Sequence, residues 1–264
     1  MDFKTLIYEK KGRKAIITMN RPNKQNSITY QMAAELGEAW GEVGADPDVW
    51  VAIVTGAGDE YFTTGVDHDE VDPAQVLKKG SLRESPTGRM TPRRAGIWKP
   101  VIAAVNGVCT ADGGWAIAMD CDVIIASENA LFWDEHVQWG SVIGTESTGM
   151  ARRMPFGEIM RLVLTSGREK MTAQRAYQIG LVSEVTPKGQ VMQAAERLAD
   201  LIAQNSPKSV QGSAQVLWQG LEIGGRQASI DNAVNIITRN QMTEDYKAGH
   251  EARVQRRKPT WKNR

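Results

Sequence analysis

The residues best suited to acid–base chemistry lie between positions 132 and 149. Histidine is scarce in this chain, which contains only His68, His136 and His250. His136 closes the segment Phe132–His136 (FWDEH), and Glu146 follows it ten residues later. A neutral imidazole can take a proton from water or from a carbon next to a carbonyl, and a carboxylate on its other nitrogen would fix its tautomer. The alternatives are a buried core histidine and a glutamate that favours a helix N-terminus.

Two glycine-containing turns can supply backbone N–H groups to an oxygen anion. One is the sequence FTTGVD at residues 62–67, and the other is Asp112-Gly113-Gly114, just before a predicted helix over Trp115–Met119. The first N–H groups of a helix have no partner within it and can hold an anion. Together with an N–H of the Gly65-Val66 turn they would form a two-donor oxyanion hole, each donor contributing about 3 kcal/mol in the transition state. Two turns that only connect strands to helices are the alternative.

Strands alternating with helices must position these residues, and this order is typical of an α/β fold. The predicted strands are short apolar runs, three of them apolar on both faces as in sheets covered by helices: Ala15–Met19, Trp50–Thr55, Val101–Val105 and Asp122–Ala126. Met32, Leu36 and Trp40 recur at helical spacing between the first two. The polar segment Asp69–Arg94 is predicted to be a mobile surface loop.

The second half of the chain is predicted to be almost wholly helical from Phe156 onward, apart from a strand-like run at Leu181–Val185. Ser206-Pro207 has the pattern of a helix N-cap followed by a first-turn proline. We therefore predict a catalytic α/β core over residues 1–190 and a helical region over residues 191–264. Helical tails of this composition often pack on neighbouring subunits.

Composition excludes several classes of protein. The 264 residues are 41% hydrophobic and 24% charged, which is typical of globular domains rather than disordered or coiled-coil chains. The 32 basic and 31 acidic residues leave a net charge of +1, so neither nucleic acid nor a membrane surface is an expected partner. Cys109 and Cys121 lack the spacing of a zinc site and are predicted to be buried free thiols. A cytoplasmic location is expected, because the N-terminus has no apolar signal segment.

Four ordered motifs resemble those of the crotonase superfamily, the enoyl-CoA hydratase/isomerase family. They are Arg21-Pro22 with Asn26-Ser27, FTTGVD at residues 62–67, KPVIAAVNG at residues 99–107 and RKPTW at residues 257–261. The resemblance covers essentially the whole chain. It implies a spiral of ββα units with a C-terminal helical trimerisation region, a homotrimer or dimer of trimers, and an acyl-CoA thioester substrate. Motif matching assigns the two oxyanion-hole N–H groups to Val66 and Gly113.

The residues that set the reaction depart from the family's hydratases, which use two glutamates to place and activate water. The first glutamate falls here on Ala116 and the second on His136. We expect His136, with Glu146, to serve as acid and base in hydration, dehydration or isomerisation of an enoyl-CoA. Glu146 also lies near the position of an aspartate in certain relatives, some of which resemble a His–Asp dyad that hydrolyses a carbon–carbon bond of a β-diketone. Hydrolytic cleavage of a cyclic β-ketone or β-diketone is one alternative, and a non-catalytic acyl-CoA-binding homologue is another.

The resemblance also implies residues that contact the acyl-CoA substrate. Those expected to do so come from or lie beside the first two motifs: Lys24, Asn26, Ser27, Thr64, Asp67 and His68. Lys24 can meet the phosphates of coenzyme A, and a solvated lysine is the alternative. Trp115, Trp133 and Trp139 would suit a ring-containing or branched acyl group, although core packing explains them nearly as well. We expect no metal, and no cofactor beyond the coenzyme A of the substrate.

Overall fold

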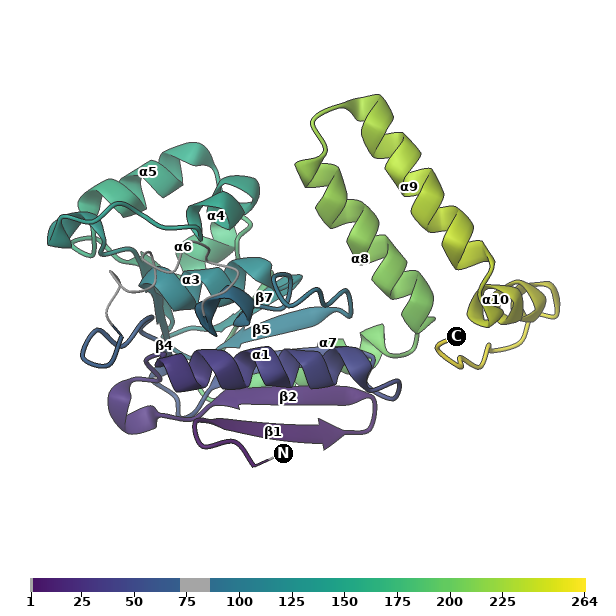
Figure 1. Ribbon diagram of the computed structural model, residues 1–264, viewed down its shortest axis with the longest axis horizontal. Helices are drawn as coiled ribbons and strands as arrows, with labels where there is room; N and C mark the ends of the chain where they lie inside the picture. The colour runs from purple at the N-terminus through teal and green to yellow at the C-terminus, as the bar shows by residue number, and fades with distance from the viewer. Residues whose placement is uncertain (1, 72–85) are drawn as a thin grey trace.

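The computed structural model describes residues 2–71 and 86–264, in which two sheets are flanked by helices (Figure 1). The larger sheet has the order β1-β2-β3-β5-β7-β10, with β1 antiparallel to β2 and the other neighbours parallel. Its strands are β1 (Leu6–Lys11), β2 (Lys14–Met19), β3 (Val51–Gly56), β5 (Val101–Val105), β7 (Val123–Ser127) and β10 (Glu184–Thr186). The predicted α/β class is confirmed, and the strand predicted at Leu181–Val185 lies slightly later, at β10.

The smaller sheet carries the segments next to the candidate site. It has the order β4-β6-β8-β9, and β9 is antiparallel to β8. Its strands are β4 (Tyr61–Thr63), β6 (Val108–Thr110), β8 (Leu131–Trp133) and β9 (Met171–Thr172). Because β4, β6 and β8 run parallel, the chain that leaves each of them emerges at one edge of this sheet.

The larger sheet is apolar on both faces because a helix covers each one. Ile17 and Val54 belong to the hydrophobic cluster that includes α1 (Tyr30–Ala45), whereas Ile16 and Ile53 join the cluster of α7 (Val191–Ile202). This alternation follows from the two-residue period of a strand. The predicted helix around Met32 and Trp40 is therefore confirmed, and so are the strands predicted to be covered on both faces.

The remaining helices lie on the smaller sheet and beyond the α/β layers. Near the smaller sheet are α3 (Ala111–Asp120), α4 (Ser147–Arg153), α5 (Phe156–Thr165), α6 (Ala173–Gln178) and the 3₁₀ turns η1 (Pro22–Lys24) and η3 (Val137–Trp139). The 3₁₀ turn η2 (Pro86–Arg89) packs against α1. The C-terminal helices are α8 (Pro207–Glu222), α9 (Arg226–Gln241) and α10 (Glu244–Val254). Of the described helices, none is both long enough and apolar enough to span a bilayer.

The helices α8 and α9 form a hairpin that extends away from the sheets, with α10 at its base (Figure 1). The hydroxyl of Ser206 accepts a hydrogen bond from the Ser209 N–H, which confirms the predicted N-cap of α8. The division after residue 190 stays a prediction, and within the predicted helical region Val191, Ala195 and Ala199 of α7 are buried against the larger sheet. By packing, α7 belongs with the sheets, and the separate helical region begins with α8.

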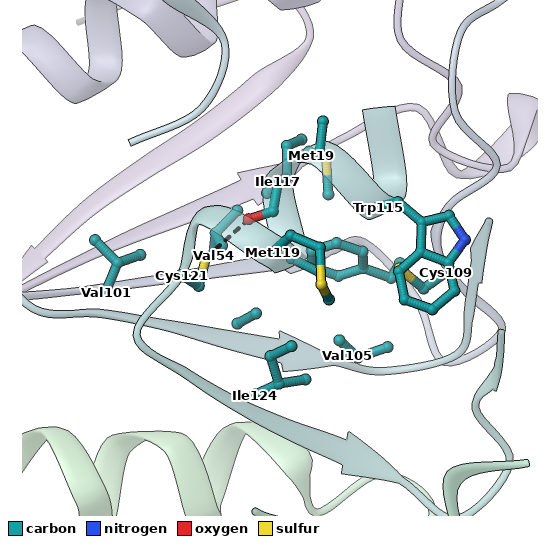
Figure 2. Close-up of a cluster of buried hydrophobic side chains, with 14 of the residues drawn as sticks. Met19, Val54, Val101, Val105, Cys109, Trp115, Ile117, Met119, Cys121 and Ile124 are labelled. Carbon is teal, nitrogen blue, oxygen red and sulfur yellow. Dashed lines mark hydrogen bonds between the residues drawn. The ribbon is translucent and has the colours of Figure 1, made fainter. Parts of the chain in front are cut away.

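A dense apolar cluster fills the space between the sheets and α3 (Figure 2). Cys109 and Cys121 lie in it as free, fully buried thiols, as predicted, and Cys121 Sγ donates to the Ile117 carbonyl oxygen at 3.2 Å. Burial raises the pKa of both thiols, most strongly through loss of hydration. Neither thiol is therefore suited to act as a nucleophile.

The predicted surface loop at Asp69–Arg94 is correct only in part. Residues 72–85 lie outside the described residues. On either side of them, Val71, Met90 and Thr91 are buried, and the Trp40 indole N–H donates to the Met90 carbonyl oxygen at 2.9 Å. Because the segment is polar overall, its sequence did not predict that these buried residues fix its two ends to the core.

Gly107 offers a sharp test of packing at the turn between β5 and β6. A Cβ atom there would lie 2.1 Å from the Glu60 carbonyl oxygen, which accepts the Val108 N–H at 2.8 Å. We expect Gly107→Ala to lower the free energy of unfolding by about 3 kcal/mol, measured by urea titration. Gly41→Ala is the matched control, since Gly41 is an exposed position in α1 with open space around it, and should raise stability by about 0.5–1 kcal/mol. Equal stability of the two variants would contradict this account of the turn.

Candidate active site

His136 is held immediately beyond the end of β8. Its Nδ1 lies 2.8 Å from Oδ2 of Asp134, and its backbone N–H donates to Oδ1 of the same carboxylate at 3.1 Å. The Asp134 side chain is fully buried, whereas the His136 side chain is 10% exposed. An ionised carboxylate can only accept hydrogen bonds, so Nδ1 carries the proton in this contact and Nε2 presents its lone pair. The arrangement leaves Nε2 as the basic atom of the ring.

Glu146 faces the other side of the imidazole, so the two residues paired by the sequence lie together. Its Oε1 is 3.7 Å from His136 Nε2 and accepts the Gly144 N–H at 3.0 Å. Glu146 also occupies the N-cap position of α4, where a negative charge is favourable, so the helix-terminus interpretation holds as well. A separation of 3.7 Å is too long for a direct hydrogen bond, but both atoms can reach one water molecule at about 2.8 Å.

Asp134 is the residue of this cluster that sequence reasoning missed. Its segment was recognised, but only Glu146 was considered as the carboxylate partner of His136. The available signal is the two-residue period of β8, since Phe132 and Asp134 share a face and Phe132 is fully buried. A carboxylate placed on a buried face needs hydrogen-bond donors, and the nearest donors in sequence belong to His136.

Asp134, His136 and Glu146 also have the donor types of a divalent-metal site. One potential ligand atom from each lies within 4.8 Å of the others. The contacts of Asp134 with Nδ1 and of Glu146 with the Gly144 N–H also suit acid–base chemistry, and we call these three residues the acid–base cluster.

The two segments proposed to form the oxyanion hole lie side by side. Ile28 forms a parallel bridge with Val66 and donates its N–H to the Gly65 carbonyl oxygen at 2.7 Å. A Cβ on Gly113 would lie 2.3 Å from Ile28 Cδ1 and 3.8 Å from the Gly65 Cα. The first turn of α3 can approach the Gly65-Val66 turn this closely because residue 113 has no side chain. The assignment of the two N–H groups as oxyanion donors stays a prediction.

The Asn26 side chain is not exposed and instead hydrogen-bonds to three neighbouring backbone groups. It is fully buried, and its Nδ2 donates to the carbonyl oxygens of Ala57 at 3.0 Å and Tyr61 at 2.8 Å. Its Oδ1 accepts the Arg21 N–H at 3.0 Å. Asn26 thus acts on any bound substrate through the position of the backbone around it.

Ser27 and Asp67 form a brace together with Arg21. The Arg21 guanidinium donates to Asp67 Oδ2 at 2.9 Å, and the Ser27 hydroxyl donates to the same oxygen at 3.0 Å. Lys24 and His68 are exposed near this network, and Thr64 is half-buried. Contacts from these residues to coenzyme A stay predictions.

Asp67 provides a test of the brace through pH. Burial raises the pKa of its carboxyl, but hydrogen bonds from Arg21, Ser27 and the Asp69 N–H outweigh burial, and the pKa is lowered overall. A lowered native pKa contributes stability above the unfolded value of about 3.9, and this contribution is lost as the pH falls through the native pKa. We expect Asp67→Asn to cost about 2 kcal/mol at pH 7 and to flatten the acid limb of a plot of stability against pH. Parallel acid limbs for the variant and the wild-type protein would contradict the brace.

A cavity of about 630 Å³ opens beside Glu146. Ala116, Met119 and Asp120 of α3 line one wall, so the position of the family's first glutamate faces the same space as Glu146. The predicted aromatic lining is wrong for Trp115, which is fully buried against Phe132 and donates its indole N–H to the Trp133 carbonyl oxygen at 2.9 Å. Trp139 is 76% exposed. The described residues that line this cavity include no aromatic side chain.

Comparison with known proteins places this chain in a family. The model of the family "Enoyl-CoA hydratase/isomerase" matches residues 9–264. The chain belongs to the enoyl-CoA hydratase/isomerase family. It is accordingly an enzyme of the crotonase type, and its α/β fold with C-terminal helices is the one that the resemblance implied.

Two curated members of the enoyl-CoA hydratase/isomerase family are similar over nearly their whole length. The chain is 34% identical to (E)-benzylidenesuccinyl-CoA hydratase of Thauera aromatica, covering 94% of this chain and 95% of that one. It is 33% identical to the short-chain-enoyl-CoA hydratase of Clostridium acetobutylicum, covering 98% and 97%. A crystal structure of an enoyl-CoA hydratase/isomerase from Mycobacterium paratuberculosis superposes with a TM-score of 0.90 at 35% identity, covering both chains completely.

Proposed function

We propose that this enzyme adds water to an enoyl-CoA, or removes it, with His136 as the acid–base group. The observation that carries the proposal is the position of His136 Nε2, 3.7 Å from Glu146 Oε1, while Nδ1 is engaged by Asp134. A water molecule held by both atoms would lose a proton to Nε2 while its oxygen attacks the β-carbon of the enoyl group. The imidazolium then gives this proton to the α-carbon of the enolate, which completes the addition of water, and dehydration follows the same steps in reverse.

The thioester oxygen is the second element of the proposed mechanism. Attack on the double bond places negative charge on that oxygen, forming an enolate. The N–H groups of Val66 and Gly113 are proposed to hold it, supported by the close approach of the two turns at Ile28. Donors that are fixed before the reaction stabilise the charge without reorganisation, and each is worth about 3 kcal/mol. In a shift of the double bond, the other reaction expected from the sequence, His136 would instead move a proton between the α- and γ-carbons through a dienolate held at the same oxygen, without uptake of water.

Hydrolytic cleavage of a carbon–carbon bond is the second candidate function. Ala116 lines the cavity where hydratases of the family carry their first glutamate, so one of the two usual carboxylates is replaced by a methyl group. The Asp134–His136 pair still suits delivery of hydroxide to the ketone carbon of a cyclic β-ketone. The bond between that carbon and the α-carbon then breaks, and the electron pair leaves as the enolate held by the oxyanion hole.

Product analysis tests these functions against each other. The purified chain is incubated with trans-2-enoyl-CoA esters and separately with cyclic β-ketoacyl-CoA esters, and products are identified by mass spectrometry. Hydration converts the enoyl ester to a hydroxyacyl-CoA and removes the enoyl thioester absorbance. Carbon–carbon hydrolysis instead opens the ring and creates a new carboxylate. Turnover of neither class, with acyl-CoA still bound, would overturn both catalytic proposals and favour the non-catalytic alternative.

We propose a homotrimer or a dimer of trimers as the working assembly. Support comes from exposed apolar side chains on the C-terminal hairpin, which would be covered by a neighbouring subunit: Leu217, Leu221, Val234 and Ile237. In such an assembly Lys24 and the basic end of α10 would lie near the phosphates of coenzyme A.

A further inference from the structure

Half of the residues that line the cavity beside Glu146 are charged. Three arginines from the segment just before β5 contribute to it, namely Arg89, Arg93 and Arg94. The apolar side chains facing it are Ala116 and Met119. A hydrocarbon chain entering this space would remove water from charged groups without replacing their hydrogen bonds, which is unfavourable. The lining therefore favours an acyl group with a polar, negatively charged end.

Arg93 and Arg94 are adjacent in sequence but have different roles. Arg93 forms an ion pair with Asp122 and stacks against Trp98 and Trp218 at 5.1 and 5.2 Å, so it is part of the framework. Arg94 is exposed, and its Nη2 donates to the Thr145 hydroxyl, the residue before Glu146. A guanidinium carries five N–H donors in a planar fork, so Arg94 keeps donors for a carboxylate after its contact with Thr145.

Asp120 lies on the same wall, one helical turn beyond Ala116. Burial raises the pKa of its carboxyl, in spite of the hydrogen bond from Thr91 and the positive charges of Arg94, Arg93 and Arg153. One oxygen of this carboxyl group already accepts the hydrogen bond from the Thr91 hydroxyl. Glu222 of α8 and Glu146 are the other carboxylates on the wall, and Glu146 is already engaged beside His136.

The length of α3 gives the distance between the proposed oxyanion hole and the polar wall of the cavity. Gly113, at the proposed oxyanion hole, and Asp120, at the polar wall, are seven residues apart on one helix. At the rise of an α-helix this separation is about 10 Å. The Asp120 end of the wall is therefore reached by the far end of a medium-length acyl chain, whereas Ala116, three residues from Gly113, lies nearer to the thioester.

We propose that the cavity is a carboxylate subsite in which Arg94 binds the distal carboxylate of a dicarboxylic acyl-CoA. This inference rests on the proposed function, because it names the substrate class of the same site. It adds a specificity-determining residue, Arg94, that lies outside the acid–base cluster. In this subsite the binding of an acyl chain with a second carboxylate is favourable, whereas its binding in an apolar acyl pocket would be unfavourable.

Binding of unreactive saturated thioesters to the full-length protein tests the subsite independently of turnover. Isothermal titration compares adipyl-CoA with hexanoyl-CoA and with the ω-methyl ester of adipyl-CoA. We expect the wild-type protein to bind adipyl-CoA roughly 10- to 100-fold more tightly than either ligand whose acyl group is uncharged. Arg94→Met should abolish this preference while the affinity for hexanoyl-CoA is retained, and Arg94→Lys should restore part of it.

Arg152→Met is the matched control. Arg152 is an exposed residue of α4 that donates to the Thr148 carbonyl oxygen and does not line the cavity, so its loss should leave the preference intact. Equal binding of adipyl-CoA and its methyl ester by the wild-type protein would overturn the subsite without the use of any variant. A preference that survives in Arg94→Met would also overturn it. If the preference holds but no enoyl-CoA is converted, the proposed reaction fails while the subsite stands.

Discussion

Replacing His136 with glutamine is expected to lower kcat for conversion of an enoyl-CoA by about 10²- to 10⁴-fold. Glutamine is a neutral side chain that can hydrogen-bond to Asp134 but cannot take a proton at the position of Nε2. The oxyanion hole and the cavity are left in place, so the affinity for an unreactive acyl-CoA should change little. The measurement is steady-state kinetics with titration of a saturated thioester on the same preparation.

His250→Gln is the control for this substitution. His250 is exposed on α10 and lies outside the cluster, so the same chemical change there should leave kcat unaltered. A His136→Gln enzyme with the kcat of the wild-type protein would remove His136 from the mechanism. The interpretation of His136 as a buried structural histidine would then be the correct one.

Replacing Asp134 with asparagine is expected to have the second-largest effect, a loss of about 10³-fold in kcat. Asp134 is a positioning residue because it acts on the substrate only through His136. An asparagine can turn its amide N–H groups toward Nδ1, which then becomes the acceptor and forces the proton onto Nε2. In that tautomer the nitrogen that faces Glu146 is no longer a base.

The tautomer itself is the readout that separates positioning from simple structural support. In ¹⁵N-labelled protein, the imidazole shifts of the wild-type enzyme should report Nδ1–H, and those of Asp134→Asn should report Nε2–H. Asp134→Glu, which keeps a carboxylate, should recover part of the activity. Loss of activity in Asp134→Asn with an unchanged tautomer would show that Asp134 supports the fold and does not orient the ring.

The inner strands of the larger sheet were predictable because both of their faces are buried, whereas β1, whose side chains are mostly exposed, was not predicted. Val101–Val105 is apolar at every position, and the structure buries all of it between α1 and α7. The boundary after residue 190 was harder to place, because an amphipathic helix has the same pattern whether its apolar face meets a sheet or another subunit. Only the packing of Val191 and Ala195 shows that α7 belongs with the sheet.

The resemblance to the family, counted from Phe132, pointed to His136, and the structure brings Glu146 to it across η3 and the loop that follows. The roles of both residues stay predictions. Asp134 was missed because it lies between the end of β8 at Trp133 and the turn that begins at His136, where the strand pattern no longer predicts burial. The polar cavity wall was unpredictable, because Arg94 and Asp120 are 26 positions apart and meet only through tertiary packing.

The central claim of the proposed mechanism is that His136 and Glu146 activate a water molecule for reaction with an acyl-CoA. Tracing the oxygen of that water tests the claim most directly. The reaction is run in H₂¹⁸O, and mass spectrometry follows label in the acyl product for the wild-type enzyme and for His136→Gln. The account predicts one ¹⁸O atom per product molecule, formed at a rate that falls by about 10²-fold or more in His136→Gln. Product without ¹⁸O, or labelling at the same rate in both proteins, would contradict it.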